Sequence, residues 1–286
     1  MMNKNPIFTG IEGDHNSYEK AKILLQSIPY DGTSTWGKGA DQGFEAFLDA
    51  AENMEIYDIE TDSEVYKQGV HIIDPILEDA SPEAMFESVY KNTQQLLATD
   101  KFLTFFGGEH SISIGIIKAF YEAHPDITIL QIDAHTDLRP EYHGAPYNHA
   151  CAVYDASQHT NLIQVGIRSM DSGELPYLDR NKCYFAEEMY GQADWMEDSI
   201  NKMTDKVYIT FDLDAFDPSI MPATGTPEPG GMLWNPTIQY LKKVFQQKKV
   251  LGFDIVELAP IEGFSAPQFL AAKLYYKMLS YKFANS

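Results

Sequence analysis

The sequence is poor in cysteine and in basic residues. Only Cys151 and Cys183 occur among 286 residues, so a disulfide framework and a cysteine-ligated zinc site are excluded. There are 21 lysines and arginines against 42 aspartates and glutamates, which gives a net charge of -21. This balance argues against a nucleic-acid partner and leaves no basic patch for a membrane surface. It suits a small cationic substrate, although solubility is the simpler explanation.

Long apolar runs are also missing. The N-terminus has no hydrophobic region of the signal-peptide type, and no run of residues approaches the length of a membrane span. We therefore expect a cytoplasmic protein. No internal repeat, low-complexity tract or linker divides the chain, which predicts a single catalytic domain over residues 1–286.

What the sequence does contain is a series of short apolar runs separated by helical patterns. The runs are typical of buried strands and cover residues 22–28, 101–106, 127–132, 162–167, 207–211 and 250–255, with a weaker one at 71–73. Helical spacing of apolar residues marks 41–53, 81–98, 111–124, 192–203 and 236–248, and a last helix after Ser265. Apolar strands that alternate with helices predict a three-layer α/β/α fold around a central, mainly parallel sheet.

Polar residues follow four of these strands at the point where each strand ends. In an open parallel sheet, ligands bind beyond the carboxyl ends of the strands, so four such clusters predict one shared site. An Asp-x-Asp pair alone is usually a turn or a cap, and a lone histidine after Gly-Gly is usually structural. Their joint occurrence at strand ends favours a functional site, with these residues: Glu109, His110, Asp133, His135, Asp137, Asp212, Asp214 and Glu257.

The most informative cluster is Asp133, His135 and Asp137, directly after the strand at 127–132. In extended backbone, alternate side chains project to one side, where uncompensated carboxylates would repel one another. With the neighbouring clusters, the ligand set is too large for one tetrahedral zinc and suits a binuclear centre with bridging carboxylates. Oxygen-rich ligation mixed with imidazole favours two Mn²⁺, with Co²⁺ or Zn²⁺ as possible substitutes.

With these residues in view, the sequence resembles the ureohydrolases, the family of arginase, agmatinase and their relatives. Three segments carry the resemblance in order: 106–111 (FGGEHS), 132–137 (IDAHTD) and 210–218 (TFDLDAFDP). The last continues into 222–231 (PATGTPEPGG), and the similarity of order and spacing spans about residues 22–280. The resemblance implies a two-manganese hydrolase in which a metal-bridging hydroxide attacks a guanidinium carbon, giving urea and an amine.

The resemblance also implies which residues hold each ion. The first ion would be held by His110, Asp133, Asp137 and Asp212, and the second by Asp133, His135, Asp212 and Asp214. Asp133 and Asp212 would therefore bridge the two ions. A homotrimer or homohexamer is implied as well.

Further roles follow from the same resemblance. Asp137 would orient the hydroxide and pass a proton to the leaving amine. Glu257 would pair with the guanidinium, because a planar cation accepts paired, charge-assisted hydrogen bonds from a carboxylate. His149 matches a histidine that shuttles protons or contacts substrate. Glu109 would orient His110 or a neighbour.

Substrate choice depends on residues outside the ligand set. Arginases carry Asn at the position of Arg139, where it helps to hold the amino-acid end of arginine, so arginine is disfavoured here. The segments 29–32, 147–150 and 227–231 are more similar to agmatinases. We therefore expect cleavage of agmatine to putrescine and urea, with Arg139 in a salt bridge with Glu141.

Four alternatives remain open. Formimidoylglutamases carry a similar Asp-Leu-Arg run, in which Arg139 could meet a substrate carboxylate, and guanidinobutyrate is a candidate for the same reason. The related deacetylases use a single zinc with fewer carboxylates, which the second pair, Asp212 and Asp214, argues against. A non-catalytic metal-binding relative is conceivable, but no ligand is missing.

Overall fold

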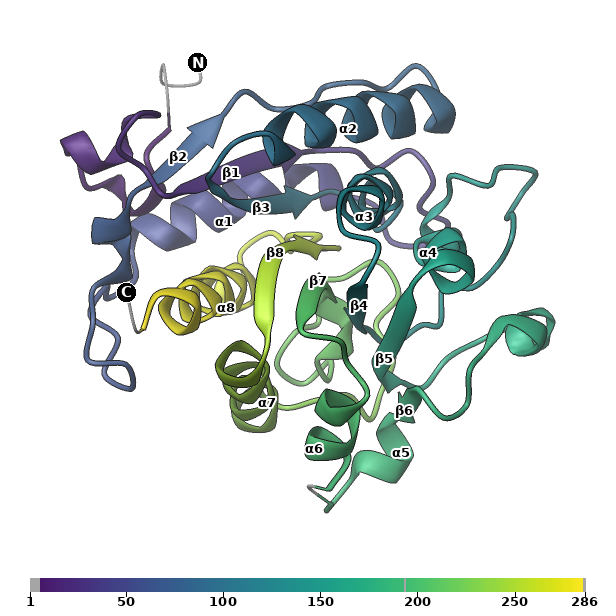
Figure 1. Ribbon diagram of the computed structural model, residues 1–286. Helices are drawn as coiled ribbons and strands as arrows, with labels where there is room; N and C mark the ends of the chain where they lie inside the picture. Colours follow the sequence, from purple (N-terminus) through teal and green to yellow (C-terminus); the bar gives the residue numbers. More distant parts are fainter. Residues whose placement is uncertain (1–5, 193, 285–286) are drawn as a thin grey trace.

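The computed structural model describes residues 6–192 and 194–284, whose strands form one eight-stranded sheet (Figure 1). Neighbouring strands are parallel throughout, in the order β2-β1-β3-β8-β7-β4-β5-β6. The predicted parallel α/β sheet is therefore confirmed. The strands are β1 Ile23–Ile28, β2 Val70–Ile73, β3 Phe102–Gly107, β4 Ile127–Ile132, β5 Asn161–Ile167, β6 Cys183–Phe185, β7 Lys206–Asp212 and β8 Lys249–Val256.

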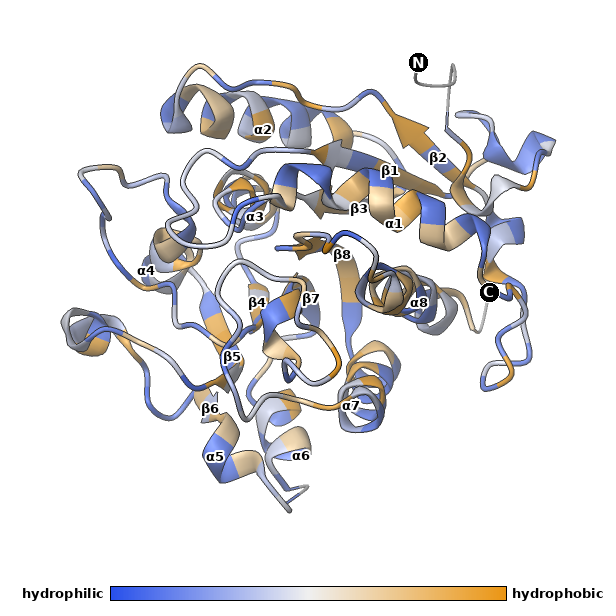
Figure 2. Ribbon diagram, turned by 180° about the vertical axis from the view of Figure 1, so that it is seen from behind, coloured by the Kyte–Doolittle hydropathy of each residue, from blue (hydrophilic) through white to orange (hydrophobic). Residues whose placement is uncertain are grey.

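Helices cover both faces of the sheet. The helices are α1 Gly43–Glu52, α2 Pro82–Leu97, α3 Ile112–Ala123, α4 Tyr154–His159, α5 Ala186–Met189, α6 Asp194–Asn201, α7 Trp234–Gln247 and α8 Ala266–Phe283. Helices α1, α6, α7 and α8 contribute to one hydrophobic cluster, and α2, α3 and α4 contribute to a second. Several of them carry bands of both hydropathy colours in Figure 2, as expected for helices with one buried face. None of the helices in these two described ranges is long and apolar enough to cross a membrane.

The alternation of side chains along β1 shows why the strands are apolar throughout. All six of its residues are buried. Ile23 and Leu25 belong to the first hydrophobic cluster, whereas Leu24 and Ile28 belong to the second. Because successive side chains point to opposite faces, a strand covered on both sides needs apolar residues at consecutive positions.

The longer elements and the short strand β2 lie close to their predicted positions, and three other short elements were missed. Helix α2 begins as expected after Ser81, whose side chain accepts a hydrogen bond from the Ala84 nitrogen at 3.1 Å. Strand β6 and helices α4 and α5 were not predicted, because three to six residues are too few to show a period. The predicted helix at 192–203 appears as α6, and residue 193 lies outside the described residues.

The strand order explains the position of the site. The four strands followed by polar clusters are β3, β4, β7 and β8, and they are contiguous at the centre of the sheet in the order β3-β8-β7-β4. Their carboxyl ends therefore open at one edge of the sheet.

Candidate metal centre and substrate pocket

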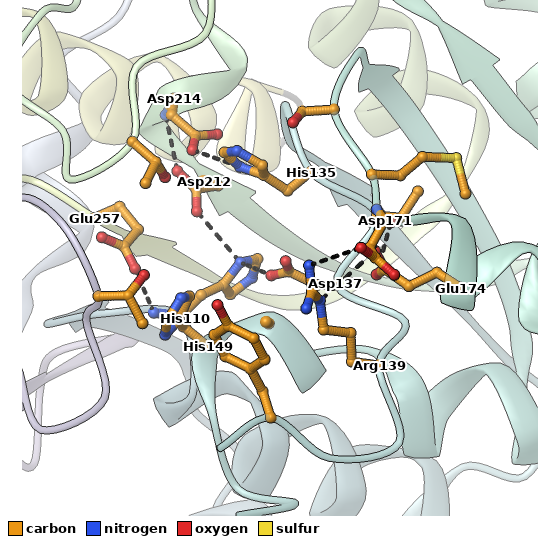
Figure 3. Close-up of a pocket in the computed structure, with 17 residues that line it drawn as sticks. His110, His135, Asp137, Arg139, His149, Asp171, Glu174, Asp212, Asp214 and Glu257 are labelled. Carbon is orange, nitrogen blue, oxygen red and sulfur yellow. Dashed lines mark hydrogen bonds and ion pairs between the residues drawn. The ribbon is translucent and has the colours of Figure 1, made fainter.

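The polar strand ends meet in one pocket of about 250 Å³ (Figure 3). Of the predicted site residues, those that line it are His110, His135, Asp137, Arg139, His149, Asp212, Asp214 and Glu257. Asp133 lies beneath the pocket surface and is completely buried. Glu109 is also completely buried and does not line the pocket. The structure thus brings the other residues that the sequence placed in the site to this one pocket.

Two groups of side chains in the described residues have the geometry of metal ligands. In each group the ligand atoms lie within 4.8 Å of one another: His110, Asp133 and Asp212 form the first, and Asp133, His135 and Asp214 form the second. Asp133 belongs to both, as a bridging carboxylate must. Asp212, the other implied bridge, is grouped with the first set only. Together with Asp137, these residues are called the floor of the pocket below.

The Nδ1 atom of His110 tests whether the floor fits a cation. This nitrogen is buried and makes no hydrogen bond. It nevertheless lies 3.1 Å from carboxylate oxygens of Asp133 and Asp137 and 3.3 Å from one of Asp212. A buried polar atom without a partner requires an explanation, and a metal ion among these four groups supplies one.

The electrostatics of the floor lead to the same conclusion. Burial, together with the charge of Asp133, raises the pKa of Asp137 to about 7. Burial and the charges of Asp214 and Asp133 raise the pKa of Asp212 well above its usual range. The pKa of Asp133 is lowered although burial opposes this, because the neighbouring imidazoles of His110 and His135 favour its ionised form. The carboxylates cannot all be ionised without compensation, and bound divalent cations provide it.

Main-chain N–H groups fix the orientation of the carboxylates in the floor. The nitrogen of His135 donates to Asp133 at 2.6 Å, and the nitrogen of Ala134 donates to Asp214 at 3.1 Å. The nitrogen of Asp214 donates in turn to Asp212 at 2.8 Å. The loop after β4 therefore positions an acid of the β7 loop, and each loop positions one acid of its own, before any ligand arrives.

A hydrogen-bond chain behind the floor determines which nitrogen of His110 carries the proton. Its Nε2 lies 2.9 Å from the hydroxyl of Thr210, which donates to Asp254 at 2.7 Å. Tyr208 and Ser113 also donate to the Asp254 carboxylate, at 2.7 and 3.1 Å. Because the hydroxyl proton of Thr210 is given to Asp254, Nε2–H of His110 must be the donor, and Nδ1 presents a lone pair to the floor.

Glu257 is held in a strained backbone conformation at the edge of the pocket. Its φ is +69° and that of Asp137 is +50°, values that cost about 1–3 kcal/mol each and cluster at functional sites. The Glu257 carboxylate accepts a hydrogen bond from the main-chain N–H of His110 at 2.8 Å. The main-chain N–H of Glu257 donates to the carbonyl of Gly108 at 2.9 Å. A Cβ on Gly108 would lie 1.9 Å from the carbonyl oxygen of Tyr30, so the turn after β3 requires glycine here.

Arg139 pairs with different acids from the one expected. Its Nε lies 3.8 Å from Glu174 and its Nη2 lies 3.9 Å from Asp171, while its guanidinium stacks 4.4 Å above the ring of Tyr142. The expected salt bridge with Glu141 is therefore wrong. These four residues, Arg139, Tyr142, Asp171 and Glu174, are called the mouth of the pocket below (Figure 3).

Glu174 is the most firmly held side chain of the mouth, and the sequence analysis did not predict it as a site residue. It is almost completely buried and accepts from the Thr136 hydroxyl and the Leu138 nitrogen, both at 2.8 Å. It also forms a capping box with Asp171 at the start of the helical turn Ser172–Tyr177. A D-x-x-E pattern shortly after the predicted strand at 162–167 was the available signal, since it marks a helix start at a fifth strand end.

His149 and Glu109 also lie at the site. Burial lowers the pKa of His149 to about 4, so the imidazole is neutral near pH 7. Glu109 is fully buried and accepts hydrogen bonds from Thr33 and Ser111. It therefore contacts neighbours of His110, and through Thr33 it reaches His149.

Comparison with known proteins identifies the family. The profile of the arginase family matches residues 21–280. An N(1)-aminopropylagmatine ureohydrolase from Synechocystis is 33% identical over 276 residues, covering 93% of this chain and 90% of the relative. An agmatinase from Halalkalibacterium halodurans is 30% identical over 251 residues, covering 86% of each. The crystal structure of the agmatine ureohydrolase of Thermoplasma volcanium superposes with a TM-score of 0.88 at 27% identity, covering 99% of this chain and 96% of that one.

The chain belongs to the arginase family and is a hydrolase of the ureohydrolase class. The resemblance that its three motifs indicated is confirmed, as is the arginase-like fold.

Proposed function

We propose that this protein is a two-manganese ureohydrolase that cleaves agmatine to putrescine and urea. The observation that carries the proposal has two parts in one pocket. Two ligand groups share Asp133, and the mouth above them keeps one negative charge that no cation of the mouth balances. The floor accounts for the reaction and the mouth accounts for the substrate.

The floor residues would hold the ions in the two groups described above. His110, Asp133, Asp137 and Asp212 would hold one Mn²⁺, and Asp133, His135, Asp212 and Asp214 the other. When bound, the pair of ions would lower the pKa of a water molecule enough for it to attack an unreactive carbon near neutral pH. The carboxylate and imidazole ligands suit Mn²⁺, with Co²⁺ or Zn²⁺ as substitutes.

The residues of the chain itself would orient the substrate and move the proton. Glu257 faces the pocket and would accept paired hydrogen bonds from the guanidinium. Asp137, which also lines the pocket, would take the proton of the attacking water on its carboxylate and return it to the departing amine nitrogen. His149 would contact the substrate or relay the proton onward from the wall of the same pocket.

The charge of the mouth supports a substrate with a cationic tail. Arg139 contributes one positive charge, but Asp171 and Glu174 contribute two negative ones. The Arg139 guanidinium is therefore occupied by carboxylates of the protein and is poorly placed to receive a carboxylate of the substrate. Asp171, whose side chain is 54% exposed, would attract the terminal ammonium of agmatine. Arginine, guanidinobutyrate and formimidoylglutamate each carry a carboxylate that this mouth would repel.

A second candidate is N1-aminopropylagmatine, whose additional amine extends the same cationic tail. It is favoured by the name of the Synechocystis relative. A longer polyamine would leave the guanidinium at the floor and place its second ammonium near Asp171 or in the solvent beyond.

A substrate panel tests the proposal. Urea release is measured from agmatine, N1-aminopropylagmatine, arginine and guanidinobutyrate, and release of the glutamate product from formimidoylglutamate, all with protein reconstituted with Mn²⁺. We expect the two cationic guanidino compounds to have the highest kcat/KM. Turnover of formimidoylglutamate alone would overturn the assignment.

A further inference from the structure

Glu109 is a completely buried carboxylate that does not line the pocket. Its Oε1 accepts from the Thr33 nitrogen at 3.1 Å and from the hydroxyls of Thr33 and Ser111, both at 2.8 Å. Its Oε2 accepts from the Ser111 nitrogen at 2.8 Å. Four donors directed at one buried group are the arrangement that stabilises an anion.

The hydroxyl of Thr33 links this carboxylate to His149, which lies 116 residues from Thr33 in sequence. The hydroxyl lies 2.8 Å from Glu109 Oε1 and 3.1 Å from His149 Nδ1, and it also receives the His149 main-chain N–H at 3.0 Å. A hydroxyl has a single proton to donate. The carboxylate is the closer and the charged acceptor, and a charge-assisted hydrogen bond is about twice as strong as a neutral one, so the proton points to Glu109.

The position of the proton on the His149 imidazole follows from the single proton of the Thr33 hydroxyl. Because Thr33 donates to Glu109, it can only accept from His149 Nδ1, so Nδ1 must carry the hydrogen. A neutral imidazole has one N–H, which leaves Nε2 with a lone pair. His149 lines the pocket (Figure 3). Its Nδ1 lies 3.1 Å from the Thr33 hydroxyl, so Nε2 is the nitrogen available to a ligand.

We propose that Glu109, acting through Thr33, is a positioning residue that holds His149 as the Nδ1–H tautomer and so presents an Nε2 lone pair to the pocket. The consequence for turnover rests on the proposed function, because the Nε2 lone pair would accept a hydrogen bond or a proton during amidine hydrolysis. The tautomer itself is a property of the protein and can be measured without any substrate.

The first test reads the tautomer directly. Ring nitrogens of ¹⁵N-histidine-labelled protein, loaded with diamagnetic Zn²⁺, are observed by NMR, and the His149 signals are assigned by their loss in His149→Ala. We expect a pure Nδ1–H pattern in the wild type and in Thr33→Ser, which keeps the hydroxyl. In Thr33→Val we expect a mixture of tautomers. An Nε2–H pattern in the wild type, or a pure Nδ1–H pattern that persists in Thr33→Val, would overturn the proposal.

The chain supplies a matched control at Thr61. Its nitrogen and hydroxyl donate to one carboxylate oxygen of Asp58, at 2.9 and 3.0 Å, as those of Thr33 donate to Glu109. Thr61 does not line the pocket. Thr61→Val therefore removes an equivalent threonine–carboxylate bond, and we expect it to leave both the His149 signals and the turnover unchanged.

Kinetics supply a second readout. We expect kcat of Thr33→Val for agmatine to fall about 10-fold or more with little change in KM, and Thr33→Ser to restore it, since proton transfer is the step affected. Glu109→Gln, which replaces two acceptor positions by donors, should act in the same direction and decides the question if Thr33→Val does not fold. An unchanged kcat in folded Glu109→Gln and Thr33→Val would count against the proposal. If the wild type releases no urea from agmatine, the proposed function fails alone, and the tautomer is still decided by NMR.

Discussion

The floor and the mouth of the pocket are built by different means. The floor combines side chains from the ends of three central strands, β3, β4 and β7. Its carboxylates are buried, and main-chain N–H groups at 2.6–3.1 Å orient three of them. The mouth combines loop side chains after β4 and β5, in which Arg139 meets its two acids at 3.8 and 3.9 Å. A rigid floor determines the reaction, whereas a looser and partly exposed mouth can change the preferred substrate without disturbing it.

The largest effect is expected at the floor. Replacing His135 with Ala removes a ligand of the second group, so we expect turnover below about 1% of the wild type and loss of about one bound ion per chain. The side chain is 24% exposed, so its removal should leave the chain folded. Elemental analysis, circular dichroism and urea release together check this. Full activity with two ions bound would contradict the assignment of His135 as a metal ligand.

A smaller effect is expected behind the floor. Thr210→Val breaks the bond between His110 Nε2 and the hydroxyl, so the affinity for Mn²⁺ should fall about 10–100-fold, while Thr210→Ser should retain it. Free Mn²⁺ measured by electron paramagnetic resonance during a titration gives the affinity. Thr104→Val is the matched control, because it removes a buried hydroxyl from β3, in the same sheet, that bonds only Leu24 and Tyr275 among the described residues. Equal affinities for Thr210→Val and the control would contradict the tautomer assigned to His110.

The two regions also differ in how far the sequence predicted them. The floor was predictable because its ligands alternate directly after an apolar strand and recur at neighbouring strand ends. The mouth was not, because Arg139 meets Glu174 across 35 residues through loop geometry that has no period, and the adjacent Glu141 was wrongly expected as its partner. The contact between Thr33 and His149 was hidden for the same reason. Sequence patterns report local order and strand ends, whereas contacts between loops depend on the packed structure.

Removing the metal should make stability depend on pH in the direction set by the floor. The raised pKa of Asp137, about 7, means that the folded protein keeps a proton that the unfolded chain loses near pH 3.8. The free energy of unfolding must therefore fall as pH rises between these values. The pKa of His135 is raised to about 12 despite burial, mainly by Asp214 and Asp133, so its contribution is also lost as pH rises above about 6.5.

Thermal melting checks this expectation. Metal-free protein should have a lower Tm at about pH 8 than at about pH 5.5, and Mn²⁺ should raise Tm more at the higher pH, because the ions replace the protons. A metal-free protein that becomes more stable over this range would contradict the description of the floor as a crowded set of acids.

The smallest effect is expected at the mouth. Asp171→Asn removes a partly exposed charge, so KM for agmatine should rise about 2–5-fold with kcat almost unchanged, the range of an exposed ion pair. Asp179→Asn, at an acid that is 51% exposed and pairs with Lys182 outside the pocket, is the control. A large fall in kcat for Asp171→Asn would show that the mouth is not separable from the floor.

The most direct test of the central claim measures urea release from agmatine against the number of Mn²⁺ ions bound per chain. The two ligand groups that share Asp133 predict that turnover rises to a maximum as the second ion binds. The charge of the mouth predicts that agmatine or its aminopropyl derivative is then cleaved in preference to carboxylate-bearing substrates. Maximal turnover with one ion per chain, or no urea from either cationic substrate at full occupancy, would contradict the account.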